Sequence, residues 1–299
     1  MRSSTLSSAA TGLSLRDLAE LTKSGITGMV VVAAAVGMLL ASRAAPGWSL
    51  WLHTLLGTAL VSSGAGALNQ VVERDRDARM RRTANRPIPA GRMHPDLALF
   101  VGVTLSVVGL LELVLAVAPL ASLLAAATLV GYVFVYTPMK RASSLATVVG
   151  AVPGAVPPMI GWAAVTGRLD AGAWALFALL FFWQMPHFLS IAWLYRADYE
   201  RGGFPMISVQ DPDGLRTARQ AVLYCAALVP VSLLPTALGL AGPIYFGGAL
   251  LLGLVFLAAS AHFALDRGAR VARRLMLVSI FYLPLVLGIL VVDRLTGWS

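Results

Sequence analysis

The chain has 299 residues, of which 58% are hydrophobic and only 12% are charged. A soluble domain carries about 25% charged residues, so this composition excludes a soluble domain, and the apolar content also excludes intrinsic disorder. The formal net charge of +9 does not indicate nucleic-acid binding, because few solvated faces remain to carry a basic patch. One cysteine, Cys225, excludes a disulfide framework and any cysteine-rich metal site. A polytopic membrane protein remains.

The apolar residues form continuous runs of the length that a transmembrane helix needs, rather than the alternation of barrel strands. The sequence therefore predicts an all-α bundle of nine transmembrane helices, with residues 25–299 as one domain. Residues 1–24 are polar and Ser-rich, which predicts a mostly disordered tail with a short helix near Leu15–Leu21. The predicted spans cover residues 25–41, 50–72, 96–116, 120–136, 145–166, 172–193, 220–238, 243–263 and 275–292.

The positive charges are distributed unevenly about these spans. Of the 23 Lys and Arg residues, 20 fall in the N-terminal segment and in the loops after the second, fourth, sixth and eighth spans. Only Arg43, Arg168 and Arg294 fall on the other side. The positive-inside rule places the N-terminus in the cytoplasm or mitochondrial matrix and the C-terminus outside. We expect an integral protein of a bacterial plasma membrane or a mitochondrial inner membrane.

Three oxygen-bearing side chains repeat every fourth residue at the end of the second span. Asn69, Glu73 and Asp77 therefore share one face of a helix, whereas Asp75 points to another side. Such a group suits a hard cation, and Mg²⁺ takes one or two carboxylates together with water and substrate phosphates. The alternative is a solvated helix end with acid–arginine pairs.

The next segment is dense in arginine and reads Arg-Arg-Thr-Ala-Asn-Arg-Pro-Ile-Pro-Ala-Gly-Arg over residues 81–92. Arginine forks pair well with phosphate oxygens. Acids that can hold Mg²⁺, followed directly by these arginines, predict a metal–diphosphate site at the cytoplasmic face of the membrane.

This combined pattern resembles the first aspartate-rich motif of the UbiA-type family of intramembrane prenyltransferases. Four later segments, taken in order, resemble the protoheme IX farnesyltransferase (heme O synthase) branch, over roughly residues 25–292. They are Tyr-Thr-Pro-Met-Lys-Arg at 136–141, the Gly- and Pro-rich stretch at 150–162, Phe-Trp-Gln-Met-Pro-His-Phe at 182–188 and Tyr-Arg-Ala-Asp-Tyr at 195–199. Two positions depart from the wider family: Glu73 replaces an Asp, and the second motif is not Asp-x3-Asp.

The resemblance implies a nine-helix enzyme that uses Mg²⁺ to ionise farnesyl diphosphate. The farnesyl group joins a vinyl group of heme b, water adds, and heme O and diphosphate are released. The family further implies hand-over of heme O to a heme A synthase. The candidate metal ligands are Asn69, Glu73, Asp77 and Asp198. The candidate diphosphate ligands are Arg82, Arg86, Lys140, Arg141 and Arg196, of which Arg196 is also a candidate for a heme propionate. Tyr195 and Tyr199 are candidates for stabilising the allylic cation through their ring faces.

His187 lies in the sixth predicted span, eleven residues before Asp198, which is roughly 16 Å deeper along a helix. An ionisable residue inside a membrane is by default a functional hypothesis. We expect His187 and Trp183 to contact heme. His187 could ligate the iron or guide water and a proton, and a helix-packing role is the alternative. The Gly and Pro residues at 150–161 predict a kinked fifth span.

Two other functions fit parts of the pattern. A prenyltransferase of the same family could act on a quinone precursor or another aromatic acceptor, although the Tyr-x2-Asp-Tyr and Pro-His-Phe segments favour heme. A transporter could also carry intramembrane acids and broken helices. Here, however, the acids gather at one membrane face beside arginines.

Overall fold

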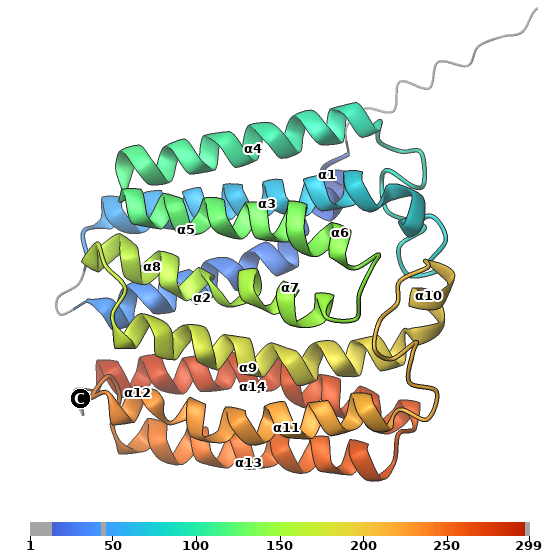
Figure 1. Ribbon diagram of the computed structural model, residues 1–299. Helices are drawn as coiled ribbons and strands as arrows, with labels where there is room; N and C mark the ends of the chain where they lie inside the picture. The colour runs from blue at the N-terminus through green and yellow to red at the C-terminus, as the bar shows by residue number, and fades with distance from the viewer. Residues whose placement is uncertain (1–13, 43–45, 297–299) are drawn as a thin grey trace, which may run out of the picture.

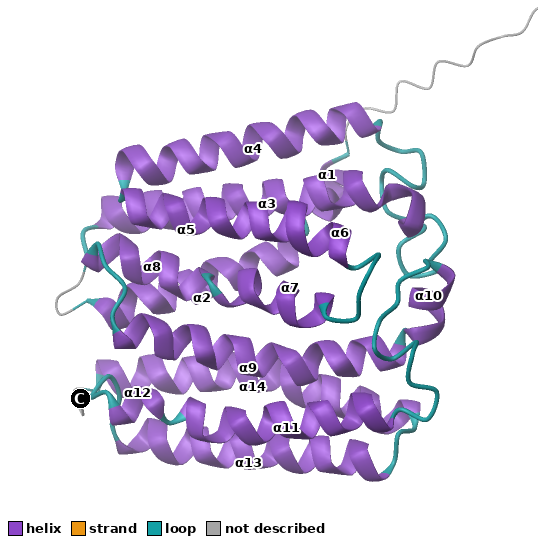
Figure 2. Cartoon of the chain, viewed as in Figure 1, coloured by secondary structure: helices purple, strands orange, loops and turns teal. Residues whose placement is uncertain are grey.

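The structure is a computed structural model that describes residues 14–42 and 46–296. This part of the chain contains helices and loops and no strand (Figures 1 and 2). The helices are α1 (Leu15–Leu21), α2 (Ser24–Ala41), α3 (Trp48–Asp77), α4 (Pro95–Ala116), α5 (Pro119–Val130), the π-helix η1 (Gly131–Tyr136), α6 (Thr137–Met139), α7 (Ala146–Ala155), α8 (Pro157–Thr166), α9 (Ala171–Leu194), α10 (Arg196–Arg201), α11 (Leu215–Ser232), α12 (Leu234–Ala237), α13 (Pro243–Leu265) and α14 (Ala269–Leu295).

Nine helical segments of the described residues are long and apolar enough to cross a membrane, which confirms the nine predicted spans. The short helix at Leu15–Leu21 is also present, whereas residues 1–13 of the expected tail lie outside the described residues. Because nine is odd, α1 and the end of α14 lie at opposite ends of the bundle (Figure 1). The loop after α3, together with α6 and α10, lies at the same end as α1, which we call the α1 end.

Three helices extend into polar sequence beyond their predicted limits. The helix α3 ends at Asp77 rather than at residue 72, α11 begins at Leu215 and α14 begins at Ala269. Apolar content marks where lipid begins and ends, but the backbone remains helical for as long as its hydrogen bonds continue. In α3 this extension carries the acidic stripe to the α1 end.

Small residues bring α2 and α8 into close contact. A Cβ at Gly161 would lie 1.9 Å from the carbonyl oxygen of Ala34, and a Cβ at Gly37 would lie 2.0 Å from that of Pro158. Lipid-embedded helices associate by such close backbone packing. The predicted kink in the fifth span is confirmed as the break between α7 and α8 at Val156, before Pro157. Gln184 of α9 stabilises this region by donating to the carbonyl of Ala151 at 2.7 Å.

The π-helix η1 was not predicted. It places the rings of Tyr132 and Tyr136 with their centroids 5.4 Å apart. Thr137 follows it and donates its hydroxyl to the carbonyl of Tyr132 at 2.8 Å. Short π-helical turns are frequent at functional sites, and this one faces the acidic end of α3.

Candidate active site

The acidic stripe of α3 is buried rather than solvated. Asn69, Glu73 and Asp77 are 2%, 3% and 0% exposed, whereas the side chain of Asp75 is 84% exposed. The spacing thus correctly placed three residues on one face and Asp75 on another. Buried polar and charged side chains require partners, and the structure supplies them to the three members of this stripe from three separate segments.

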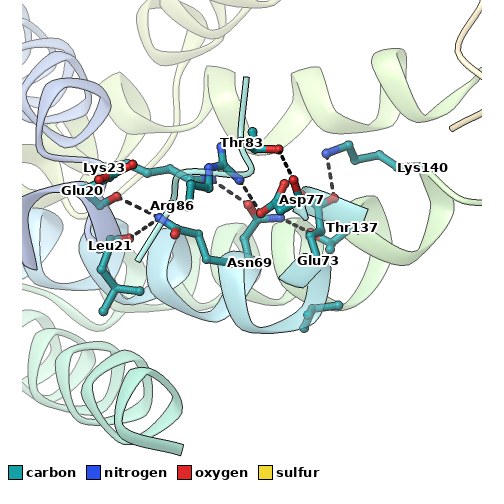
Figure 3. Close-up of polar contacts among 12 residues, drawn as sticks. Glu20, Leu21, Lys23, Asn69, Glu73, Asp77, Thr83, Arg86, Thr137 and Lys140 are labelled. Carbon is teal, nitrogen blue, oxygen red and sulfur yellow. Dashed lines mark hydrogen bonds and ion pairs between the residues drawn. The ribbon is translucent and has the colours of Figure 1, made fainter. Parts of the chain in front are cut away.

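Each member of the stripe faces one cationic side chain (Figure 3). The Nζ of Lys140 lies 2.7 Å from Oε1 of Glu73, and Nη1 of Arg86 lies 2.6 Å from Oδ2 of Asp77. The Nζ of Lys23 donates to Oδ1 of Asn69 at 2.6 Å. These cations precede α2, follow α3 and follow α6, so the fold brings distant parts of the sequence to one site.

Lys23 was missed as a site residue, because before the first span it reads as one more topological charge. It adopts a left-handed backbone conformation (φ 51°) at the start of α2, and its Nζ also lies 3.2 Å from the hydroxyl of Tyr132. Burial, with repulsion from Arg86, lowers the pKa of Lys23 to about 7. Its place directly before the first span was the only available signal.

Lys140 has the opposite electrostatic environment. Burial alone would lower the pKa of Lys140, but the Tyr136 phenol and the Glu73 carboxylate together hold that pKa above its usual range. The ammonium lies 5.3 Å from the ring centroid of Tyr136 and 5.0 Å from that of Phe204. Lys140 is therefore a permanent cation at the site.

Neutral side chains fix the geometry of the stripe. The Thr83 hydroxyl donates to the carbonyl of Asp77 at 2.9 Å, which folds the arginine-rich segment back over the end of α3. The Asn69 amide donates to the Thr137 hydroxyl at 3.1 Å. Gln70 donates to the carbonyls of Glu20 and Leu21 and thereby attaches α1.

The second acidic motif meets the arginine-rich segment at the α1 end. Asp198 of α10 is 8% exposed; it accepts from the backbone N–H of Arg81 at 3.2 Å and from the guanidinium of Arg201. The Arg82 guanidinium lies 5.3 Å from the ring centroid of Tyr195 and 5.9 Å from that of Tyr199.

A small apolar cluster of Met80, Phe204 and Met206 holds the two segments together. Phe204 was not predicted as a site residue. It is 1% exposed, and the Arg76 guanidinium lies 5.0 Å from its ring centroid. Arg76 also donates to the carbonyls of Gly202 and Gly203. The loops after α3 and α10 are thus packed as one unit.

The remaining predicted residues lie apart from the stripe contacts. Arg141 donates to the carbonyl of Val72 at 2.6 Å, and the Arg196 guanidinium lies 4.3 Å from the ring centroid of Trp193. Trp183 and His187 lie together on α9, where both contact Ser279 of α14.

The donor set fits a hard divalent cation held by few protein ligands. The Oδ1 of Asp77 is buried and has no hydrogen-bond partner; an orphaned carboxylate oxygen of this kind calls for a ligand. Among the described residues no group of three or more His, Cys, Asp or Glu is arranged to hold a metal. The acids therefore do not form one compact cage, which agrees with the preference of Mg²⁺ for one or two carboxylates plus water and phosphate.

Comparisons with known proteins place these features in a family. A sequence model described as the UbiA prenyltransferase family matches residues 30–285. The chain is 47% identical to a protoheme IX farnesyltransferase of Solibacter usitatus, over 94% of this chain and 99% of the relative. It is 50% identical to a protoheme IX farnesyltransferase of an Anaeromyxobacter species, over 91% of each chain.

Solved structures share the fold at low sequence identity. A digeranylgeranylglyceryl phosphate synthase superposes with a TM-score of 0.79 at 15% identity, covering 94% of this chain and 99% of the other. A UbiA homolog from Archaeoglobus fulgidus bound to GPP and Mg²⁺ superposes with a TM-score of 0.63 at 14% identity, covering 92% of this chain and 99% of the other.

Proposed function

Because this chain belongs to the UbiA prenyltransferase family, we propose that it transfers the farnesyl group of farnesyl diphosphate to a vinyl group of heme b. Water adds in the same reaction, and the products are heme O and diphosphate. The relatives that are similar over nearly their whole length carry the name of this activity. The structural observation that supports it most directly is the buried stripe of Asn69, Glu73 and Asp77, faced by three cations.

We assign the ionisation of farnesyl diphosphate to this stripe. Glu73 and Asp77, with Asn69, would hold Mg²⁺ on one side, and Asp198 is the candidate ligand on the other. The bound metal would supply electrostatic stabilisation of the charge that develops on the leaving diphosphate. Lys140 and Arg86 already lie at the acids and Lys23 lies at Asn69, so all three would stand beside a phosphate bound there, where preplaced positive charge lowers the barrier.

Tyr195 and Tyr199 receive a different role from the one their aromatic rings suggested. The Arg82 guanidinium covers both rings, so we propose that they position Arg82 for the diphosphate instead of stabilising the allylic cation. The apolar interior of the bundle protects that cation from bulk water. Arg141 and Arg196, which contact the main chain and a tryptophan, are assigned to the rim of the site.

The acceptor would lie deeper, beside α9. His187 and Trp183 lie about two and three helical turns before the end of α9 at Leu194, which is the direction in which a farnesyl chain would extend from the diphosphate. We propose that the α1 end faces the cytoplasm of a bacterium, because 20 of the 23 Lys and Arg residues lie on that side. The product would then pass to a heme-modifying enzyme such as heme A synthase.

The test uses the purified full-length protein in lipid nanodiscs with heme b, farnesyl diphosphate and Mg²⁺. Extracted heme is analysed by mass spectrometry for the hydroxyethylfarnesyl addition. Wild type should form this product, and Asp77→Asn should reduce its rate on the order of 10²-fold, as expected when a preorganised electrostatic partner is lost. Asp75→Asn is the matched control, because Asp75 lies two residues away on the same helix but is exposed. Equal rates for both variants would refute the assigned site.

The same assay separates the alternative acceptor. If 4-hydroxybenzoate is prenylated in place of heme b, the chain is a quinone-directed member of the family. Membership of a prenyltransferase family argues against the transporter alternative. A nanodisc encloses no second compartment, so product formation in nanodiscs would show an activity that does not depend on transport.

A further inference from the structure

Two side chains of α9 contact a single residue of α14. The Trp183 indole N–H donates to the carbonyl of Ser279 at 2.8 Å. The Nδ1 of His187 lies 2.7 Å from Oγ of Ser279. The Trp183 and His187 rings are stacked, with centroids 5.4 Å apart and an interplanar angle of 15°. Ser279 itself is fully buried, so the imidazole plane is fixed on one face by Trp183 and at one edge by Ser279.

The position of one proton follows from the other contact of Ser279. Its Oγ lies 2.5 Å from the carbonyl oxygen of Met276, and a serine hydroxyl has only one hydrogen to donate. If this hydrogen pointed to His187, the lone pairs of two oxygens would face each other at that distance. The hydrogen therefore lies between Ser279 and Met276, and Oγ accepts from Nδ1–H of His187.

This arrangement leaves an electron pair on Nε2. A neutral imidazole with its proton on Nδ1 is an acceptor at Nε2. Within the described part of the chain, Nε2 makes no hydrogen bond and is not among the fully enclosed polar atoms. A histidine that serves only to pack two helices would need no such open lone pair, and lipid chains offer it no partner.

The pattern matches the way proteins prepare a histidine for a metal. Ligating histidines almost always donate their other ring N–H to an oxygen atom, which fixes the tautomer and the ring orientation. Imidazole is also a common axial ligand of heme iron. We propose that Ser279 is a positioning residue that holds His187 in the Nδ1–H tautomer, so that Nε2 coordinates the iron of the bound heme substrate. This inference rests on the proposed function.

Trp183 then supports His187 through ring stacking, whether or not its ring also contacts heme. Its N–H is already used by the Ser279 carbonyl, which joins α9 to α14 at the level of the imidazole. Ligation would fix the depth and the tilt of the heme, and hence which vinyl group faces the farnesyl diphosphate. Removing the Ser279 hydroxyl should therefore affect heme binding before it affects diphosphate chemistry.

The experiment titrates ferric heme b into the purified full-length protein without farnesyl diphosphate. Absorption and electron paramagnetic resonance spectra report the axial ligand. Wild type should show a histidine-ligated heme, and His187→Ala should lose that signature. Ser279→Ala should weaken heme binding by about 10- to 100-fold, the usual effect of removing the partner of a ligating histidine. Ser279→Thr, which keeps the hydroxyl, should retain the wild-type affinity and spectrum.

Ser260→Ala is the matched control. Ser260 is equally buried and also donates to the carbonyl three residues earlier, that of Leu257 at 2.8 Å, but it lies on α13 rather than α14. It should bind heme as wild type does. Added imidazole should restore the ligated spectrum of His187→Gly, which shows that the variant has folded.

The outcomes separate this inference from the proposed function. If Ser279→Ala binds heme with the wild-type affinity and spectrum, or if His187→Ala keeps a histidine-ligated heme, the inference is overturned even when wild type makes heme O. If wild type makes no heme O but the spectra change as expected, the enzyme assignment fails while the ligand assignment stands.

Discussion

Variants of the ion pair between Lys140 and Glu73 can separate the contribution of this pair to stability from its contribution to catalysis. The two charged atoms are 2.7 Å apart, and the side chains are 13% and 3% exposed. Glu73→Gln removes the negative partner and leaves a buried ammonium beside Tyr136 and Phe204. Breaking one side of a buried pair costs about 3–5 kcal/mol. Because the two aromatic faces still stabilise the cation, we expect a loss near the lower limit, about 3 kcal/mol.

The double variant Glu73→Gln/Lys140→Met tests whether that loss comes from the stranded charge. A well-packed apolar replacement of a buried pair is often neutral, so the free energy of unfolding in mixed micelles should return to within about 1 kcal/mol of wild type. Heme O formation should not return, because both the proposed metal ligand, Glu73, and the proposed phosphate partner, Lys140, are gone. The reasoning is refuted if Glu73→Gln is as stable as wild type, or if the double variant regains activity.

Three further predictions concern parts of the chain away from the reacting groups. Asp293→Ala removes the buried acceptor of the first N–H groups of α13 and should lower the free energy of unfolding by about 1–3 kcal/mol; an unchanged value would contradict the cap. Gly161→Val forces a side chain against the Ala34 carbonyl and should cost about 1–3 kcal/mol, whereas Gly28→Ala, in open space, should not. Burial alone would raise the pKa of Asp211, but two bonds from Thr217 hold that pKa below its usual value. The stabilisation from Asp211 is therefore complete above about pH 4 and lost as the pH falls through the lowered pKa, and Asp211→Asn should flatten this acid limb in unfolding curves.

The helices were predictable because the lipid bilayer around the chain restricts which backbone structures can span it. Every backbone group in lipid must bond within its own helix, so apolar runs, loops and the distribution of arginines fix the number of spans. The stripe on α3 followed from the helical period alone, and so did the separation of Asp75. The apolar span was placed short of the end of α3 because hydropathy marks lipid rather than helix; of the polar residues 73–77, only Glu73 and Asp77 are buried.

The contacts of the site were not predictable to the same degree. Lys23 reaches Asn69 only because the chain turns through a left-handed residue before α2, and Tyr132 faces that lysine because of a π-helical turn. Neither feature has a local sequence signal, since each depends on how α2, α3 and η1 pack. The same holds for Ser279, which gains its importance from α9 across a helix interface.

The charge balance of the site bears on the order in which its ligands bind. Lys140 and Arg86 offset Glu73 and Asp77, while Lys23 faces the neutral side chain of Asn69, so these contacts carry excess positive charge whenever Lys23, with its pKa lowered to about 7, is protonated. A divalent cation that binds alone would be repelled by these buried positive side chains, and water screens little of that repulsion. A diphosphate that binds together with the cation would attract the same side chains and so remove the repulsion. Mg²⁺ and farnesyl diphosphate should therefore each raise the affinity for the other by the same factor. Isothermal titration of Mn²⁺ or Mg²⁺ with and without a non-hydrolysable farnesyl diphosphate analogue measures this factor, and Lys23→Met should reduce it by strengthening metal binding in the absence of the analogue. Equal metal affinities in the two titrations would contradict this coupling. They would show that the Lys and Arg side chains do not oppose metal binding and that the acids alone form the metal site.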